Sequence, residues 1–388
     1  MATNSNRVDA ARRAAAALLL WSALLAPAWP AEVVLQPVPL VRGLAHPWSL
    51  AFLPDFERSG RMLVTERPGR LRIVTARGEV GAPLAGVPEV DARGQGGLLD
   101  VALDPKFADN GLVYLSYAEA GDGGNGTAVA RGRLELQGPL AGRLVDVQVI
   151  FHQRPKVQST AHFGSRLVFA RDGRLFVTLG DRYSRRDDAQ RLDSHLGKIV
   201  RIEADGRVPA DNPFVATQGA LPEIWSFGHR NVQGAALHPQ SGALWIDEHG
   251  PQGGDEVNLA LAGRNYGWPV ITYGAEYVTG RKIGEGVAKA GMEQPLTFWV
   301  PSIAPSGMAF LTSGRYPGWQ GSLFVGALKD EMLVRLQLDG TRVVAQERLL
   351  QGKLGRIRDV RQGPDGWLYV LTDADDGQLV RLETRAVR

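Results

Sequence analysis

The sequence contains no cysteine, which excludes disulfide bonds, thiol nucleophiles and thiolate metal sites. A chain of 388 residues with 44% hydrophobic content can bury a core large enough to fold without disulfides. The net charge of +3 is too small to indicate nucleic-acid binding. The histidines lack the compact spacing of a zinc site, and neither a G-x-S-x-G turn nor a phosphate-binding loop is present.

Long apolar runs are also scarce. The run Ala14–Leu25 is too short to span a membrane comfortably, so no stable membrane insertion is expected. Three arginines lie in residues 7–13 before it, and the A-x-A-like sequence Ala26-Pro27-Ala28 follows it. This order predicts a signal peptide over residues 1–28 and a mature periplasmic protein that begins near Trp29. The alternatives are an uncleaved anchor and export by the twin-arginine route.

Glycine and proline, by contrast, are abundant, at 47 and 23 residues, which favours many short strands joined by tight turns. A turn followed by an apolar strand recurs six times, at residues 53–65, 104–115, 171–178, 238–245, 316–325 and 363–370. The copies are about 45 to 80 residues apart, and a four-stranded propeller blade needs roughly 45–50 residues. We therefore predict an all-β fold, a six-bladed β-propeller over residues 33–388, with a β-sandwich as the alternative.

Polar residues gather at the strand ends, most densely within residues 223–269. Arg230 and Asn231 follow an apolar strand, and both residue types can bind carboxylate or carbonyl oxygens. The backbone carbonyls of Gly250 and Pro251 suit a hard cation such as Ca²⁺. Since propellers bind ligands in the loops around their central channel, these strand ends are the candidate site.

Three other loops add candidate residues, each with a plainer alternative. Gln95 stands among glycines that allow close backbone approach, although a simple turn would look the same. His162 precedes a strand and is either a general base or a structural hydrogen-bonding residue. Arg356 and Arg358 alternate along a predicted strand and so share one face. Together with Lys329 they indicate an anionic ligand, unless the strand is a solvated sheet edge.

Taken together, these segments resemble the soluble PQQ-dependent sugar dehydrogenases, and more closely their aldose sugar dehydrogenase branch. Nine motifs carry the resemblance in family order over almost the whole mature chain. They are GQGGLLDVALDPKF (94–107), AHFGSRLVF (161–169), VTLGD (177–181), DNPF (211–214), EIWSFGHRNVQG (223–234), HGP with DEVNL (249–259), GRNYGWP (263–269), ALKD (327–330) and RIRDV (356–360).

The resemblance implies oxidation of an aldose at C1 to a lactone, with a hydride passing to the quinone of PQQ. In this family pattern His162 is the general base, and Gln95 and Asp181 line the substrate and cofactor pocket. Arg230 and Asn231 contact the quinone oxygens, with Arg230 placed to steady a developing oxyanion.

The resemblance also implies the remaining ligands. Three cations hold the cofactor carboxylates, the carbonyls of two loop residues bind a catalytic Ca²⁺, and a carboxylate and a carbonyl bind a second, structural Ca²⁺. The three cations are Lys329, Arg356 and Arg358. The loop residues that bind the catalytic Ca²⁺ are Gly250 and Pro251. Glu256 supplies the carboxylate and Tyr266 the carbonyl for the structural Ca²⁺. The implied partners are an aldose substrate and an electron acceptor, either a cytochrome or a quinone, and both a monomer and a homodimer are compatible with the pattern.

The chain departs from the glucose-specific members at three positions. Ala161 replaces an aspartate beside the base, so His162 is expected to act without a neighbouring carboxylate there. His249 and Arg186 each replace a glutamine. These changes favour the aldose sugar dehydrogenase branch. Two other functions remain open from the residues alone: a calcium-dependent propeller lactonase, and a non-enzymatic extracellular propeller that binds a glycan or a protein.

Overall fold

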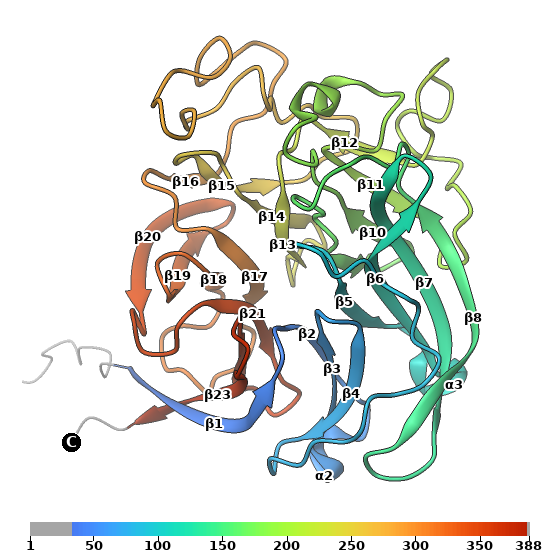
Figure 1. Ribbon diagram of the computed structural model, residues 1–388. Helices are drawn as coiled ribbons and strands as arrows, with labels where there is room; N and C mark the ends of the chain where they lie inside the picture. Colours follow the sequence, from blue (N-terminus) through green and yellow to red (C-terminus); the bar gives the residue numbers. More distant parts are fainter. Residues whose placement is uncertain (1–32, 386–388) are drawn as a thin grey trace, which may run out of the picture.

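The computed structural model describes residues 33–385, which form a six-bladed β-propeller (Figure 1). Five sheets have four strands and one has three. This confirms the predicted all-β fold and its six blades. The predicted signal peptide over residues 1–28 lies outside the described residues.

The blades follow the chain in order, and each of the first five is built from consecutive strands. The first three blades contain β2 (Pro47–Phe52), β3 (Arg61–Glu66) and β4 (Arg70–Thr75); β5 (Leu98–Leu103), β6 (Leu112–Gly121), β7 (Gly124–Leu136) and β8 (Gly142–His152); and β9 (Leu167–Phe169), β10 (Leu175–Thr178), β11 (Lys198–Ile202) and β12 (Ile224–Phe227). The next two contain β13 (Val232–Leu237), β14 (Leu244–Glu248), β15 (Asp255–Leu259) and β16 (Thr297–Trp299); and β17 (Pro305–Phe310), β18 (Leu323–Ala327), β19 (Met332–Asp339) and β20 (Arg342–Leu349).

The last blade closes the ring, because it combines the two ends of the described chain. Strand β1 (Val34–Leu44) pairs antiparallel with β23 (Gly377–Arg385), beside β22 (Leu368–Thr372) and the inner strand β21 (Ile357–Gln362). Each inner strand contacts the inner strands on both sides, in the order β2, β5, β9, β13, β17, β21 and back to β2. Closure of this kind leaves only short, protected sheet edges.

The helices of the described residues are short: α2 (Phe56–Ser59), α3 (Phe107–Asn110) and the 3₁₀ helix η1 (Arg186–Gln190). Within residues 33–385, none is long and apolar enough to cross a membrane.

The six predicted turn-and-strand copies are the second strands of the six blades. They correspond to β3, β6, β10, β14, β18 and β22, whose described residues are almost all buried. Their side chains pack between neighbouring blades, in clusters that combine two sheets each. An apolar strand recurred at this interval because every blade must bury both of its faces against its neighbours.

Paired charges join the inner strands around the channel. The Nη1 atom of Arg166 lies 3.1 Å from Asp100 and 3.2 Å from Asp359, and Arg361 lies 3.1 Å and 2.9 Å from the same two carboxylates. Asp100, Arg166 and Asp359 are almost completely buried. Because each charge faces an opposite one, the desolvation cost of burying it is offset. The network links three blades beneath the loops described next.

Candidate active site

The candidate residues meet because of where they stand on their strands. Most of them lie just before the first strand of a blade or just after the second, whereas Arg358 lies within β21, Glu256 within β15 and Tyr266 after β15. In an antiparallel pair, the start of one strand and the end of the next share one edge of the sheet. Bulges recur at this edge between the first and second strands of five blades, for instance at Val232/Gly234 and Ile357/Asp359. Bulges next to a site re-aim side chains, and here they aim polar groups toward the channel.

His162 is held by a carboxylate. Its Nδ1 atom lies 2.7 Å from Oδ1 of Asp181, and the two side chains are 6% and 1% exposed. The Gln95 side-chain oxygen accepts a hydrogen bond of 2.8 Å from the His162 backbone N–H. The expectation that His162 acts without a carboxylate because of Ala161 is therefore wrong. Asp181 comes from the end of β10, and sequence spacing alone did not place it beside the imidazole.

The two loops that carry this pair are tightly fitted. His162, Arg182 and Tyr183 all have positive φ angles, at 53°, 60° and 63°. Such backbone strain in non-glycine residues persists only where the surroundings enforce it, and it concentrates at functional sites. A Cβ on Gly180 would lie 2.0 Å from the His162 carbonyl oxygen, so only glycine fits there. The buried Arg182 guanidinium donates from Nε to the Ala161 carbonyl and thus ties the loops together.

The surroundings set the charge states of the pair. Burial lowers the pKa of His162 below 6.5, opposed by its hydrogen bond to Asp181 and assisted by the positive charge of Arg230. Burial alone would raise the pKa of Asp181, but the hydrogen bond and charge of His162 lower it below its ordinary value. Near neutral pH the imidazole is therefore neutral and the carboxylate is ionised. A carboxylate only accepts hydrogen bonds, so Nδ1 carries the proton and Nε2 is free to accept one.

Arg230 turns its guanidinium toward the loop after β14. Its Nη1 atom donates 3.0 Å to the His249 carbonyl and 2.7 Å to the Gly250 carbonyl. The Pro251 carbonyl accepts no hydrogen bond from any described residue. Asp255 positions this loop, since one of its carboxylate oxygens accepts the Gly250 N–H at 2.8 Å. The loop therefore offers backbone carbonyl oxygens, one of the ligand types that calcium binds. The Gly250 oxygen already accepts a hydrogen bond from Arg230.

The two arginines of the predicted cation cluster differ in burial and in their distance from a shared carboxylate. Arg358 is 8% exposed on the inner strand β21, so the solvated-edge alternative is wrong. Its Nη2 atom lies 2.9 Å from Asp373, whereas Nη2 of the more exposed Arg356 lies 3.7 Å from the same carboxylate. Arg356 precedes β21 rather than alternating within it. The two side chains nevertheless approach the same carboxylate, that of Asp373.

A relay of amides connects this cluster to the other candidate residues. Arg358 donates from Nη1 to Gln233 at 2.9 Å, and Gln233 donates to the side-chain oxygen of Asn231 at 3.3 Å. Asn231 in turn accepts the Gly164 N–H at 3.2 Å, two residues from His162. Residues from three blades are thereby fixed relative to one another.

A cavity of about 480 Å³ lies at the loop after β14. It is lined by both loop carbonyl residues and by the exposed Lys329, whose Nζ donates to the Ser302 carbonyl at 3.0 Å. The buried Nε of Arg358 has no hydrogen-bond partner among the described residues. An orphaned guanidinium N–H and a nearby ammonium fit a planar polycarboxylate, so these residues suit the carboxylates of PQQ.

A second, smaller cavity of about 20 Å³ lies under Arg230, large enough for one ion or water. Glu248, Glu256 and Tyr266 line it. Burial, reinforced by the nearby Glu248 carboxylate, raises the pKa of Glu256 to about 8. Two carboxylates forced together in this way fit a divalent cation, which would neutralise both. The predicted pair Glu256 and Tyr266 is thus brought together, and Glu248 joins it.

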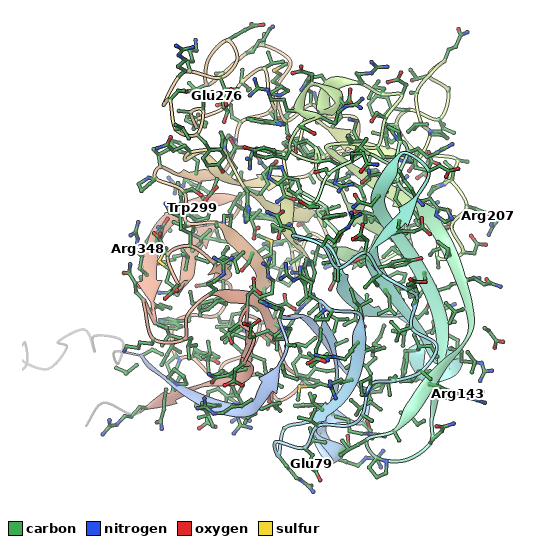
Figure 2. The ribbon with its side chains drawn as sticks, in the orientation of Figure 1. Glu79, Arg143, Arg207, Glu276, Trp299 and Arg348 are labelled. Atoms are coloured by element: carbon green, nitrogen blue, oxygen red, sulfur yellow. The ribbon has the colours of Figure 1, made fainter. Side chains whose placement is uncertain are left out.

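A third cavity of about 260 Å³ lies next to the histidine, between Tyr183, Arg230 and Trp268. Its rim is bridged by Arg186, whose Nη1 lies 2.6 Å from Glu276. Figure 2 shows Glu276 in the long connection between β15 and β16. This space, open to solvent and beside the base, is the candidate sugar subsite.

Several functional candidates went unpredicted. Glu248, Asp373 and Gln233 reach the site from strand ends, and Trp268 and Tyr277 come from the long connection. Trp268 stands inside the GRNYGWP motif, so its place in a site segment was visible from the sequence. Gln233 likewise stands inside the EIWSFGHRNVQG motif, whereas Asp373 carries no local signal, because only the packed blade brings it to Arg358.

Comparison with known proteins agrees with this geometry. The chain is 48% identical over 360 residues to the aldose sugar dehydrogenase YliI of Escherichia coli (strain K12), covering 92% of this chain and 95% of that protein. The crystal structure of the soluble aldose sugar dehydrogenase from Escherichia coli in the apo form matches with a TM-score of 0.86 at 48% identity, over 91% of this chain and 100% of that one.

A more distant structure is the PQQ-bound form of the aldose sugar dehydrogenase from Streptomyces coelicolor. It matches with a TM-score of 0.75 at 30% identity, over 92% of this chain and 99% of that one. The family model for glucose/sorbosone dehydrogenase matches residues 44–381, nearly the whole described chain. The family model and these relatives show that the chain belongs to the glucose/sorbosone dehydrogenase family.

Proposed function

We propose that the protein oxidises aldose sugars at C1 to lactones, with PQQ and calcium as its cofactors. The observation that carries the proposal is the 2.7 Å contact between His162 and Asp181 beside a cavity lined by cations. When bound, PQQ would supply the hydride acceptor, and calcium would act on it as a Lewis acid. The chain supplies a general base, a subsite for the sugar, and cations that would hold the cofactor carboxylates.

His162 takes the proton from the C1 hydroxyl at its free Nε2 atom. Asp181 holds the Nδ1–H tautomer and stabilises the imidazolium that forms. Arg230 lies close enough to lower the pKa of His162 and lines the same cavity, so it can steady negative charge that develops on an oxygen there. Loss of this proton and of the C1 hydride together would leave the lactone carbonyl.

For the cofactors, Lys329, Arg356 and Arg358 would hold the carboxylates of PQQ, and Asn231 would join Arg230 at its quinone oxygens. Gly250 and Pro251 would hold a catalytic calcium through their carbonyls. Two further groups would hold a structural calcium, namely the Glu256 carboxylate and the Tyr266 carbonyl. Tyr266 offers that oxygen free, because no described residue donates a hydrogen bond to it.

The lactonase alternative requires a central metal held by side-chain carboxylates. Among residues 33–385, no group of three or more His, Cys, Asp and Glu side chains could hold a metal ion. A purely binding propeller has no need of a buried histidine–aspartate pair. Both observations favour the dehydrogenase.

The signal-like N-terminus leads us to propose a periplasmic location. N-terminal sequencing of the exported protein should find a start near Trp29. A protein that retains Met1 or Ala2 after export would contradict this.

The function is tested by adding PQQ and Ca²⁺ to purified protein and following sugar-dependent reduction of an artificial dye acceptor. We expect turnover only when both additions are present. Lactone hydrolysis without PQQ, and no dye reduction with any aldose of a substrate panel, would favour the lactonase.

A further inference from the structure

We propose that Trp268 is a positioning residue for the general base, acting through a hydrogen bond from its indole N–H to Asp181. This inference rests on the proposed function, in which His162 accepts the proton. It adds a residue to the reaction that touches neither the histidine nor the proton.

The contact is short and buried. The Nε1 atom of Trp268 donates 2.7 Å to Oδ2 of Asp181, and the two side chains are 6% and 1% exposed. The other carboxylate oxygen, Oδ1, faces His162 at 2.7 Å and accepts the Tyr183 N–H at 2.8 Å. Within the described part of the chain, the indole is the sole hydrogen-bond donor to Oδ2.

The hydrogen bond from the Trp268 indole determines how the Asp181 carboxylate is oriented. A buried carboxylate oxygen without a donor is costly, so Oδ2 remains where the indole N–H meets it. With Oδ2 fixed, Oδ1 points at Nδ1 of His162 and holds the proton there. The unprotonated Nε2 is then the atom that faces away from Asp181. Without the indole, the carboxylate can rotate, and the imidazole can place its proton on Nε2, where it cannot act as a base.

Trp268 is itself held firmly, in a different blade from Asp181. Its backbone N–H donates to the Gly228 carbonyl at 2.9 Å, and its own carbonyl accepts a hydrogen bond of 2.7 Å from Gln190. The ring lines the candidate sugar subsite and lies 5.3 Å from the centre of the Arg230 guanidinium. One side chain therefore forms a wall of the subsite and fixes the carboxylate behind the base. A rigid partner of this kind preserves the proton position when the sugar enters.

The charged groups around the imidazole are few. Asp181 raises the pKa of His162, whereas Arg230 and Arg182 lower it. The ring of Tyr183 packs edge-on at 5.3 Å. If His162 lost its contact with Asp181, the influence that raises its pKa would be removed. The two arginines that lower this pKa would remain.

The test compares Trp268→Phe, which keeps the ring and removes the N–H, with wild type and with Trp225→Phe. Trp225 is a matched control, because its indole N–H donates to the Ala260 carbonyl instead of the site. Thermal midpoints of all variants establish that they fold. The first readout needs neither sugar nor cofactor: ¹⁵N NMR of histidine-labelled protein, with the His162 signals identified by their loss in His162→Gln. The second is stopped-flow reduction of bound PQQ by sugar across pH.

We expect wild type and Trp225→Phe to show the Nδ1–H tautomer of His162, and Trp268→Phe to show a mixture. The reduction rate of Trp268→Phe should fall about 10- to 100-fold, the loss typical of one hydrogen bond to a charged group. The acid limb of its pH profile should move to lower pH.

Two results would overturn the role of Trp268. One is a wild-type tautomer with a wild-type rate. The other is a retained Nδ1–H tautomer with the acid limb moved to higher pH, which would mean that the indole only disperses the carboxylate charge. If instead His162→Gln reduces PQQ at the wild-type rate, the proposed base is wrong, whatever Trp268→Phe does.

Discussion

The guanidinium of Arg230 donates a hydrogen bond of 2.7 Å to the carbonyl oxygen of Gly250, the same oxygen that the family pattern implies as a calcium ligand. The cation-binding loop therefore already faces a positive charge. Calcium at this point must share the carbonyl with Arg230 or displace the guanidinium. The neighbouring cavity, which Arg230 also lines, has two carboxylates, those of Glu248 and Glu256.

Calcium removal should thus have two separable effects. Chelation is expected to abolish sugar oxidation and to lower the thermal midpoint, because an ion bound only by the folded state stabilises it, by about 2.7 kcal/mol at 100 times its Kd. Glu256→Gln should lose most of the calcium-dependent rise in midpoint, measured by calorimetry with and without the ion. Full activity in metal-analysed, chelated protein would rule out a catalytic calcium.

Substitutions of the cations proposed to hold the PQQ carboxylates should affect PQQ affinity and protein stability to different degrees. Lys329 is exposed, so Lys329→Ala should weaken PQQ binding, measured by fluorescence titration, while leaving the thermal midpoint unchanged. Arg358→Ala should cost roughly 2–5 kcal/mol of PQQ binding, since a cofactor carboxylate loses a buried partner. It should also lower the midpoint, because the half-buried Asp373 loses its 2.9 Å ion pair. Unchanged PQQ affinity in both variants would remove the cations from the site.

The pH dependence of sugar oxidation follows from the histidine. His162 must be neutral to accept a proton, and its pKa lies below 6.5. The rate should therefore rise with pH through a pKa below that value and remain flat above it. His162→Gln should lower kcat by ~10²–10⁴-fold and abolish this rise. PQQ and calcium should still bind, because neither is assigned to this side chain. An acid limb centred above pH 7 in the wild type would contradict the burial of the base.

The pair Arg186 and Glu276 should control which sugars enter. Both side chains are roughly 40% exposed, at 42% and 37%, so breaking the pair should change stability by no more than ~1 kcal/mol. Arg186→Ala widens the rim of the subsite and should improve kcat/KM for disaccharides relative to monosaccharides. Glu276→Gln, which keeps the side-chain size, should change this ratio less. Equal ratios in wild type and Arg186→Ala would place the sugar elsewhere.

The buried charges of the channel should matter for folding more than for catalysis. Asp359→Asn leaves Arg166 and Arg361 facing one carboxylate instead of two, and should cost about 3–5 kcal/mol in unfolding free energy. Asp339→Asn, in an exposed pair with Arg342, is the control and should leave the denaturation midpoint unchanged. Equal midpoints for both variants would mean that the channel network does not stabilise the propeller.

Local sequence determined the architecture. Each blade needs an apolar second strand buried on both faces and a turn before it, so the period of strands such as 112–121 and 323–327 was readable as a propeller. The identities of His162, Arg230 and Arg358 were readable in the same way. His162 and Arg230 precede the first strands of their blades, and Arg358 lies at the start of β21; strand ends on one sheet edge must meet.

Tertiary structure decided the partners of those residues. Asp181 reaches His162 across two loops of one blade, Trp268 reaches Asp181 from the next, and Asp373 reaches Arg358 from a neighbouring strand end. The sequence separations, 87 residues for the indole contact, carry no local signal. Burial then sets the pKa of the imidazole, and burial is a property of the packed blades. The chain alone thus specifies which chemical groups are present, whereas the closed ring determines which of them touch.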